Sequence, residues 1–431
     1  MTQATTRADS PTPTTGRALL DATLGPLADC WEGNTTLSID GQPLSARIPT
    51  SPAYVYSRRC LDAAFDRLRA QLPAGIGIHY AIKANPFPPL VRHLAGRVDG
   101  FDCASEAEMR LAADVASPGQ HLSIAGPAKS RAEHRFAIER GVTINAESEG
   151  ELERISAVAQ ATGRRARVAL RVNPPFSLKG SGMHMGGGAR PFGIDSEAIP
   201  ALLAQRERLE AAGIDLVGLH LFAGSQSLDH EAIGQALTAW TDLLRDWQAE
   251  TGFTPGELII GPGLGVAYHP GERPLDLERL APAFRRLDET LRGLGEAGGV
   301  AIDTRLELGR FLVAAAGVYL TRVVDRKVSR GRTFLLCDGG MHHHLALSGN
   351  LGAVLRRNWP LVAADRLDAP ADESVDLAGP LCTPLDVLGR DQALPTLAVG
   401  DSVAVLQSGA YGASASPSGF LSREAAVEYL I

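Results

Sequence analysis

Several side chains able to do chemistry stand where short apolar runs of the sequence end. Lys83 ends the apolar run in HYAIKANP, and Glu307 and Arg310 end the run TRLELGR. The glycine-rich stretch GPGLG (261–265) follows a third run, and Ser225 closes a fourth. A single lysine at the end of a strand is most often a solvated charge. Its chemistry therefore depends on whether the other groups converge on it.

Together these groups suit an aromatic cofactor that carries a phosphate and an aldehyde. The backbone N–H groups of 261–265, the Arg310 guanidinium and the Ser225 hydroxyl can bind a phosphate. The Lys83 amine can form a Schiff base with an aldehyde. A carboxylate such as Glu307 can keep a pyridine nitrogen protonated, which makes the ring an electron sink. These residues predict pyridoxal 5'-phosphate as the cofactor.

The elements that must position these residues alternate between short apolar runs and longer segments with helical spacing. The helical segments include 130–141 and 149–162, which open with a capping Ser or a first-turn acid. The candidate strands are 78–83, 100–105, 121–126, 142–148, 167–173, 216–225, 257–263 and 304–310. Eight such units between residues 50 and 310 predict a (β/α)8 barrel, with a doubly wound open sheet as the alternative.

In a barrel the loops after the strands meet at one mouth, where binding groups gather. The polar and aromatic residues at the predicted strand ends are Lys83, Ser105, Asn145, Glu147, Arg171, Asn173, His220, Phe222, Ser225, Glu307 and Arg310. So many polar groups at one mouth are costly unless a charged ligand binds there.

The remainder of the chain predicts a second, all-β domain formed by residues 21–49 and 311–431. Segments 318–328, 332–340 and 401–412 are β-rich, and 35–48 could add strands. Residues 1–20 are expected to be a disordered tail. The stretch KGSGMHMGGGARPFG (179–193) reads as a loop too irregular for a strand, either a mobile flap or a surface loop.

Composition excludes several classes of protein. The 431 residues carry a net charge of −7, and Lys and Arg are scattered, so we expect no nucleic-acid partner. Five cysteines without a C-x-x-C pair argue against a disulfide framework and a zinc ribbon. No signal peptide and no run of 18 apolar residues is present, so we expect no membrane span and a cytoplasmic location.

Seven motifs resemble the ornithine/diaminopimelate decarboxylase family in order and spacing. They are HYAIKANP, GLHLFAGSQ, IIGPGLGVAY, ELGR, CDGGMHHH, GPLCTPLDVLG and SGAYG, and the resemblance covers about residues 50 to 425. It implies an alanine-racemase-like barrel plus a β-domain. Within the family the sequence resembles in particular the decarboxylases of secondary metabolism, such as the butirosin-pathway enzyme that acts on a glutamyl group tethered to an acyl-carrier protein.

The resemblance implies roles for individual residues. Lys83 would hold the cofactor, Glu307 would face its pyridine nitrogen, and the phosphate would be bound by Ser225, Gly263, Arg310 and Tyr411. Cys382 would come from the neighbouring subunit of a homodimer with shared active sites and would reprotonate the α-carbon. Asp338 would lie near the amino-acid substrate.

Three departures from the family pattern bear on substrate and cofactor. An acidic residue that pairs with a distal ammonium usually follows the catalytic cysteine, but Thr383 stands there. We therefore expect a substrate whose far end is neutral, acidic or attached to a carrier. Phe222 replaces the histidine that usually stacks on the cofactor ring, and Pro262 replaces the central glycine of the usual triple, removing one N–H.

The HHH run at 342–344 invites a metal interpretation. If the run is a strand, at most His342 and His344 share a face, and no acidic or cysteine ligand lies at a typical spacing. We expect no metal, and substrate contact by His342 or local packing instead.

The predicted activity is α-decarboxylation of an amino acid or an amino-acid derivative. Alternatives are a diaminopimelate- or ornithine-type decarboxylase of a free amino acid, an amino-acid racemase, and an inactive binding homologue. An arginine against the pyridine nitrogen would suit a racemase, whereas Glu307 favours decarboxylation.

Overall fold

The computed structural model describes residues 15–178, 180–184, 186–269, 271–349 and 357–431. The chain divides into two compact units. The barrel unit comprises residues 65–266 and 275–312, and the sheet unit comprises residues 1–64, 267–274 and 313–431. The helix α3 (Arg58–Arg69) contains the boundary at residue 64.

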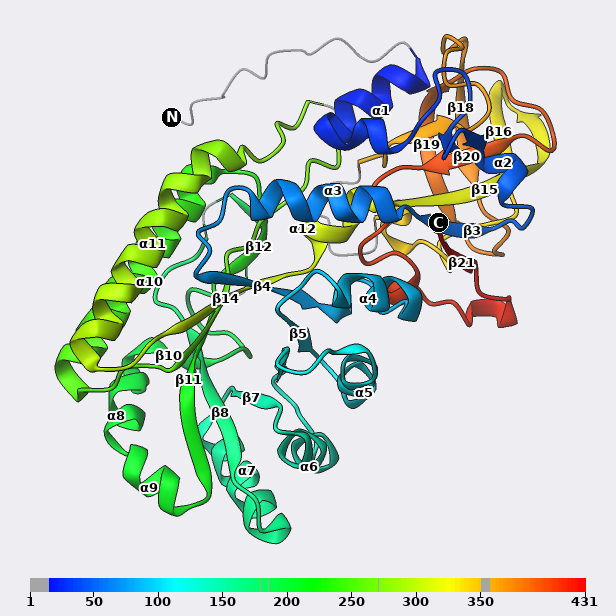
Figure 1. Ribbon diagram of the computed structural model, residues 1–431. Helices are drawn as coiled ribbons and strands as arrows, with labels where there is room; N and C mark the ends of the chain where they lie inside the picture. The colour runs from blue at the N-terminus through cyan, green and yellow to red at the C-terminus, as the bar shows by residue number, and fades with distance from the viewer. Residues whose placement is uncertain (1–14, 179, 185, 270, 350–356) are drawn as a thin grey trace, which may run out of the picture. The chain divides into compact units, whose positions relative to one another are not determined.

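The described strands of the barrel unit close into a ring of eight parallel strands (Figure 1). The order around the ring is β8, β11, β13, β14, β4, β5, β6 and β7, and pairing of β7 with β8 closes it. The strands are β4 (Ile76–Ala81), β5 (Gly100–Cys103), β6 (His121–Ile124), β7 (Thr143–Ala146), β8 (Ala166–Asn173), β11 (Ile214–Phe222), β13 (Glu257–Gly261) and β14 (Asp303–Leu308). The predicted barrel is confirmed, and the open sheet is excluded.

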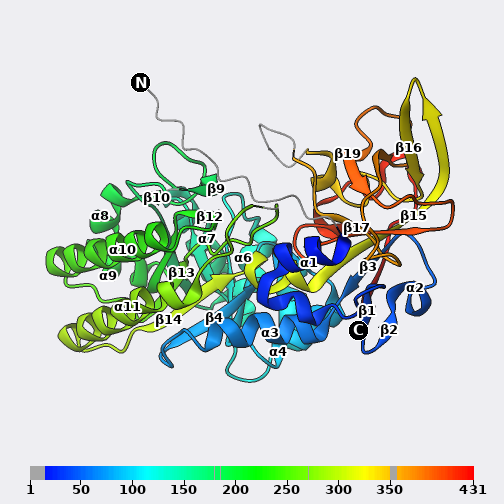
Figure 2. The ribbon, with the colours of Figure 1, turned by 90° about the horizontal axis from the view of Figure 1, so that it is seen from above.

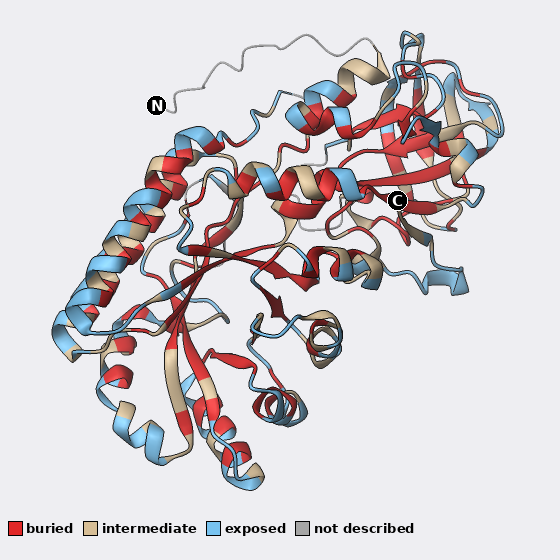
Figure 3. Cartoon of the chain, in the orientation of Figure 1, coloured by how far each residue is buried: buried red, intermediate tan, exposed pale blue. Residues whose placement is uncertain are grey.

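Helices follow the strands and pack outside the ring; Figures 1 and 2 both show α10 and α11 side by side there. They are α4 (Pro88–Ala95), α5 (Glu106–Val115), α6 (Arg131–Arg140), α7 (Glu149–Thr162), α8 (Ile199–Ala204), α9 (Arg206–Ala211), α10 (His230–Thr251) and α11 (Leu277–Gly298). Strand residues are largely buried, whereas the helices alternate between buried and exposed faces (Figure 3).

Side-chain caps explain where several of these helices start. The Ser130 hydroxyl accepts a hydrogen bond from the Glu133 amide, and the Glu133 carboxylate accepts one from the Ser130 amide, which makes a capping box before α6. Ser105 and Ser148 also cap α5 and α7, where their hydroxyls accept from the amides of Glu108 and Glu151. Ser105, which the sequence placed at the barrel mouth, is therefore a helix cap.

The barrel interior contains a chain of polar side chains where such barrels usually hold branched aliphatic residues. Asp102 lies 3.3 Å from His79 and accepts a hydrogen bond from Ser123, and Asn145 donates to Ser123 at 3.2 Å. Nearer the start of the strands, Glu257 accepts from His121 at 3.0 Å.

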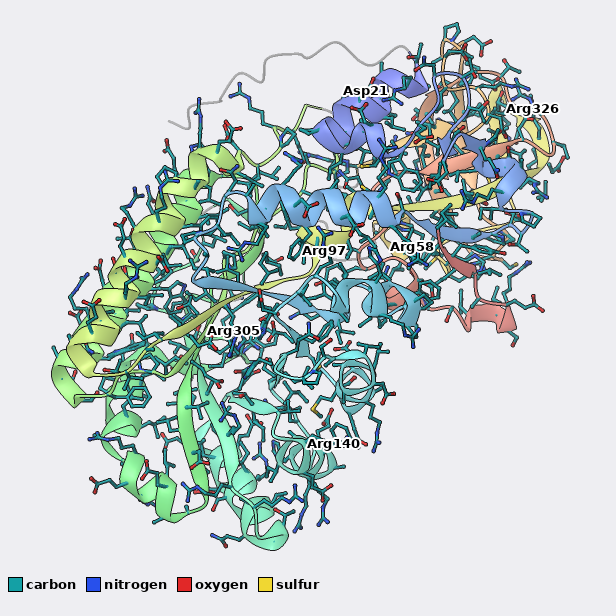
Figure 4. All side chains as sticks on the ribbon, viewed as in Figure 1. Asp21, Arg58, Arg97, Arg140, Arg305 and Arg326 are labelled. Atoms are coloured by element: carbon teal, nitrogen blue, oxygen red, sulfur yellow. The ribbon has the colours of Figure 1, made fainter. Side chains whose placement is uncertain are left out.

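Arginines complete this interior chain around Glu257. Arg167 pairs with Glu257, and Arg305 lies 3.6 Å from it. Figure 4 shows Arg305 among the barrel strands, in contrast to Arg140 at the end of α6. The charges of the network keep the pKa of Glu257 low: burial raises it, but His121, Arg167 and Arg305 outweigh burial and bring it to about 2.

The stretch 179–193 differs from its prediction. Residues Ser181–His184 form the strand β9, which pairs antiparallel with β12 (Gly224–Ser227). The prediction that it was too irregular for a strand was wrong, because the strand depends on its partner and not on an alternating pattern. Lys179 and Met185 lie outside the described residues.

The sheet unit contains an eight-stranded sheet in its described residues. Its strands are β3 (Ala53–Tyr56), β15 (Gly317–Ser329), β16 (Arg332–Cys337), β17 (Leu361–Ala363), β18 (Glu373–Ala378), β19 (Val387–Leu394), β20 (Ser402–Val405) and β21 (Val427–Leu430). The long hairpin of β15 and β16 is visible in Figure 2. The predicted second, β-rich domain is confirmed.

The N-terminal part of the described chain differs in two places from what the sequence predicted. Segment 35–48 belongs to the sheet unit, but its strands β1 (Ser38–Ile39) and β2 (Gln42–Pro43) pair with each other, and α2 (Leu44–Arg47) follows. Most of the predicted disordered tail lies outside the described residues, while residues from Gly16 onward form α1 (Gly16–Leu24). Among the described helices, none has the length and apolar character needed to cross a membrane.

Candidate active site

Lys83 lies just past the end of a barrel strand. The sequence predicted it as the last residue of its strand, but β4 stops at Ala81 and Lys83 lies in the short 3-10 helix η2 (Ile82–Ala84). Asn85 fixes this turn, because its side chain accepts from the Phe87 amide at 3.1 Å and its carbonyl from the Tyr80 hydroxyl at 2.9 Å. The Lys83 side chain is 41% exposed, which leaves its amine accessible at the mouth.

Glu307, near the end of β14, is a buried carboxylate between two donors. Its Oε1 lies 2.7 Å from Lys83 Nζ, and its Oε2 lies 3.0 Å from His220 Nε2 on β11. Burial alone would raise the pKa of Glu307, but the Lys83 charge and the His220 hydrogen bond outweigh burial and hold this pKa well below its usual range. Glu307 is therefore ionised at neutral pH.

Phe222 presents an aromatic face beside these charges. Its ring centroid lies 5.6 Å from Lys83 Nζ and 5.7 Å from Arg171 Cζ, so two cations lie at cation–π distance from the ring. The ring packs against Gly261 on the neighbouring strand β13, where an added Cβ would lie 1.9 Å from the ring. Glycine at 261 is what allows Phe222 to occupy this place.

Arg171 is itself held in position at the end of β8. Its Nη1 donates to Glu147 Oε1 at 2.8 Å. Glu147 also accepts from the amides of Gly126, at 2.6 Å, and Gly193, at 3.1 Å. The carboxylate thereby joins the loops after two strands to the arginine beside Phe222.

The predicted phosphate-binding residues of the barrel unit lie on three segments, two of which are hydrogen-bonded to each other. Ser225 is on β12, and Gly263 follows β13 with a positive φ of 74°. The Ser227 amide donates to the Gly263 carbonyl at 2.9 Å, which ties the glycine-rich turn to β12. Arg310 opens the short helix α12 (Arg310–Val313), three residues after Glu307.

The other predicted site residues lie in the sheet unit. Tyr411 adopts a positive φ of 53°, which is uncommon for a bulky residue and typical of strained functional positions. Cys382 is exposed, and Thr383 follows it in the turn between β18 and β19. Asp338 is satisfied within the unit: its Oδ1 accepts from Ser51, Thr321 and the Arg322 amide at 3.1, 2.9 and 2.9 Å.

The three histidines at 342–344 lie at a turn and not on a strand, which corrects the premise of the predicted facing pattern. All three are buried. His343 Nε2 lies 2.8 Å from the Glu424 carbonyl, and His344 Nε2 lies 3.0 Å from Ser408 Oγ. Among the described residues, no group of three or more His, Cys, Asp or Glu is placed to hold a metal ion.

His342 differs from its two neighbours. It is 0% exposed, and neither ring nitrogen has a hydrogen-bond partner among the described residues. Burial, together with the charges of His343 and Arg423, lowers the pKa of His342 to about 4, so its ring is neutral at neutral pH. Its predicted contact with substrate remains a prediction.

Three groups near Lys83 received no role from the sequence. His220 was noted only as a strand-end residue, although its position two residues before Phe222 places both on one face of β11. The Arg171–Glu147 pair could be suspected from two opposite charges at neighbouring strand ends. Glu108, whose Oε2 accepts from the Ala104 amide at 2.7 Å, gave no signal. Burial raises the pKa of Glu108, and the Ala104 amide and the Lys83 charge oppose this rise.

The donor set in the barrel unit fits pyridoxal 5'-phosphate. An accessible amine, a carboxylate that stays ionised when buried, an aromatic face, a glycine-rich turn and an arginine are each what one part of that cofactor requires. Lys83, Glu307, Phe222, Gly263 and Arg310 are the residues expected to hold it.

Comparisons with known proteins agree with this chemistry. Residues 58–314 match the family described as pyridoxal-dependent decarboxylase, pyridoxal binding domain. The L-glutamyl-[BtrI acyl-carrier protein] decarboxylase of Niallia circulans is 34% identical over 398 residues, which cover 90% of this chain and 90% of the relative.

Two further relatives carry other substrates in their names. The 2-[(L-alanin-3-ylcarbamoyl)methyl]-2-hydroxybutanedioate decarboxylase of Staphylococcus aureus is 27% identical, covering 86% of this chain and 91% of the relative. The crystal structure of Helicobacter pylori diaminopimelate decarboxylase complexed with L-lysine has a TM-score of 0.77 at 26% identity, covering 90% of this chain and 93% of that one. The chain belongs to the ornithine, arginine and diaminopimelate decarboxylase family, whose members are pyridoxal-phosphate-dependent amino-acid decarboxylases.

Proposed function

We propose that this enzyme removes the α-carboxylate of an amino-acid derivative whose far end is neutral, acidic or attached to an acyl-carrier protein, in secondary metabolism. The observation that carries the proposal is the lack of the usual acid beside Cys382, together with the hydrogen bonds that the nearby carboxylates already accept. Thr383 replaces the usual acid. Oδ1 of Asp338 accepts from three donors, and both carboxylate oxygens of Asp386 accept from buried backbone amides. Neither Thr383 nor Asp386 therefore offers a free carboxylate to a distal ammonium.

A cationic side chain also lies against that turn. Arg423 Nη2 donates to the Pro380 carbonyl at 3.2 Å, two residues before Cys382. A guanidinium there favours a carboxylate or a carbonyl group over an ammonium. The glutamyl-carrier substrate in the name of the Niallia circulans relative has such a far end.

Each residue of the proposed site has a task that follows from its position. Bound pyridoxal phosphate supplies an electron sink for the electrons left when CO2 departs. Lys83 would hold the cofactor covalently, Glu307 would pair with its ring nitrogen, and Phe222 would offer its aromatic face to the ring. The phosphate would be bound by Gly263, Ser225, Arg310 and Tyr411, and the substrate side would be lined by His342, Asp338 and Thr383.

Cys382 is proposed as the acid that protonates the α-carbon. Its thiol is exposed, as an acid that must reach a substrate requires. We propose that it acts on the site of a partner subunit in a homodimer. We also propose that the enzyme is located in the cytoplasm.

A panel of substrates tests the proposed substrate class. CO2 release would be measured from L-glutamate, glutamyl-carrier protein, L-ornithine, L-lysine and meso-diaminopimelate. We expect turnover of a glutamyl derivative and little turnover of the three diamino acids. High turnover of any diamino acid would refute the proposal.

A substitution beside Cys382 tests the reason for this preference. Thr383→Glu restores an acid where relatives have one, so we expect it to raise kcat/KM for L-lysine or meso-diaminopimelate by about tenfold or more, as one new charge pair can supply. Thr383→Gln has nearly the same shape without the charge and should give no gain. Equal gains from both variants would show that size, and not charge, sets the preference.

A free diamino acid remains the second candidate, because the Helicobacter pylori structure binds L-lysine in the same fold. The substrate panel separates the two. A racemase is less well supported, since an ionised Glu307 against the ring nitrogen strengthens the electron sink. Loss of optical rotation without release of CO2 would identify a racemase.

A further inference from the structure

One buried side chain, Asp386, hydrogen-bonds both to the turn that carries Cys382 (379–386) and to the turn that leads into the histidines (338–343). Asp386 is 2% exposed. Its Oδ1 accepts from the Met341 amide at 2.6 Å, and its Oδ2 accepts from the Leu381 amide at 2.7 Å. Each carboxylate oxygen thus holds a different turn, and one of them holds the residue directly before Cys382.

Backbone bonds close the same turn from within. The Gly379 amide donates to the Asp386 carbonyl at 3.0 Å, and the Asp386 amide donates to the Thr383 carbonyl at 3.2 Å. Residues 379–386 therefore form a small closed loop in which Cys382 is exposed and Thr383 is half-buried.

Two glycines leave the space that the carboxylate fills. An added Cβ at Gly340 would lie 2.4 Å from Asp386 Oδ1, and one at Gly379 would lie 2.3 Å from Asp386 Oδ2. No side chain larger than hydrogen fits at either position while the carboxylate stays. Burial raises the pKa of Asp386, and the amides of Met341 and Leu381 oppose this rise.

We propose that Asp386 is a positioning residue whose carboxylate ties the Cys382 turn to the 338–343 turn and so fixes where the thiol lies. The inference rests on the proposed role of Cys382. In that role the thiol gives its proton to the carbon that CO2 has left and becomes a thiolate, which regains a proton from water. A thiol held in one place delivers that proton to one face of the carbon.

Asp386→Asn tests the fastening directly. An asparagine has one carbonyl oxygen for two amide donors, and its NH2 would face the other amide. We expect hydrogen exchange of the segments containing Met341 and Leu381 to accelerate by about tenfold, as loss of one hydrogen bond to a charged group predicts. Exchange of β4 in the barrel unit should not change. Asp391→Asn, an exposed Asp-to-Asn change in the same unit, is the matched control.

The stereochemistry of the product tests the positioning. In D2O the wild type should place deuterium on one face of the α-carbon, whereas Asp386→Asn should give a mixture of both configurations. A purely structural loss would lower the amount of product without mixing its configuration. Single-configuration product from Asp386→Asn, or unchanged exchange at both turns, would overturn the proposal.

Two further variants separate the possible failures. If Asp386→Asn does not fold, Gly379→Ala presses on the same carboxylate from the other side and should produce the same exchange and mixing; the absence of both would overturn the proposal. Cys382→Ser tests the proposed acid by itself. If it keeps the wild-type rate and configuration, the role of Cys382 fails, even where the exchange result for Asp386 stands.

Discussion

Glu307 keeps its charge in a buried place because Lys83 and His220 each face one of its oxygens. Its folded pKa is lowered, so this carboxylate favours the folded state above its ordinary pKa, and the benefit is lost as the pH falls through the lowered value. When Lys83 is bound to the cofactor, the His220 hydrogen bond still favours the ionised carboxylate.

Removal of His220 should make Glu307 easier to protonate. In His220→Leu the donor to Oε2 is gone while burial remains, so the pKa of Glu307 rises. We expect a drop in kcat of about 10- to 100-fold, since a hydrogen bond to a charged group is lost, and an acidic limb of the pH–rate profile displaced to higher pH. His220→Gln retains a side-chain N–H and should recover part of both effects. A His220→Leu profile identical to that of the wild type would remove His220 from the site.

At the scale of elements, the end of β13 decides whether an aromatic face can form. The chain needs glycine at 261 because Phe222, paired with it across the strands β11 and β13, occupies the space of a Cβ. The aromatic platform is therefore a property of two adjacent strands and not of Phe222 alone.

Gly261→Ala should displace the ring. We expect a loss of about 1–3 kcal/mol in the free energy of unfolding from overpacking, together with weaker retention of the cofactor on dialysis. Gly261→Ala combined with Phe222→Ala removes the clash, so its stability should be closer to that of Phe222→Ala alone. Urea unfolding of the four proteins measures this coupling, and simple additivity would contradict it.

The acid sensitivity of the barrel should depend on Glu257. Its pKa falls from the ordinary 4.5 to about 2 on folding, so its contribution to stability is complete above pH 4.5 and is lost between pH 4.5 and 2. In Glu257→Gln the free energy of unfolding should be lower at neutral pH and should change less over that window. Urea unfolding at a series of pH values tests this, and parallel curves for the two proteins would contradict it.

The elements were predictable where local signals sufficed. Each barrel strand is a short apolar run, and helix caps such as Ser130 and Ser148 mark the boundaries between units. β9 could not be predicted, since it exists by pairing with β12. The partnership of His220 with Glu307 also depends on the strand order, because β13 lies between their strands. The role of Asp386 could not be predicted from the sequence, because its partners are backbone amides, which every residue except proline has.

At the scale of the whole molecule, the residues expected to act together divide between the two units. Lys83 and Glu307 belong to the barrel unit, and Cys382 belongs to the sheet unit. The proposed homodimer would bring the thiol of one subunit to the barrel of the other, so that each site draws on two chains.

Mixing inactive variants tests this arrangement. Lys83→Ala and Cys382→Ala subunits, mixed after dissociation, should regain about one quarter of the wild-type activity, since half of the dimers are mixed and each has one intact site. Lys83→Ala mixed with Glu307→Ala is the control; both lesions lie in the barrel unit, so no mixed dimer has an intact site. Equal results for the two mixtures would contradict the shared site.

The polar chain inside the barrel also has a consequence for how the strands can be threaded. Neighbouring residues of a strand point to opposite faces, so a slip of β5 by one residue would turn Asp102 outward and Phe101 inward, and a slip of β7 would do the same to Asn145 and Ile144. The interior partners of the displaced polar group would then lose their hydrogen bonds. An aliphatic interior would lose less on such a slip, so the polar interior of this barrel specifies the register of its strands more strictly.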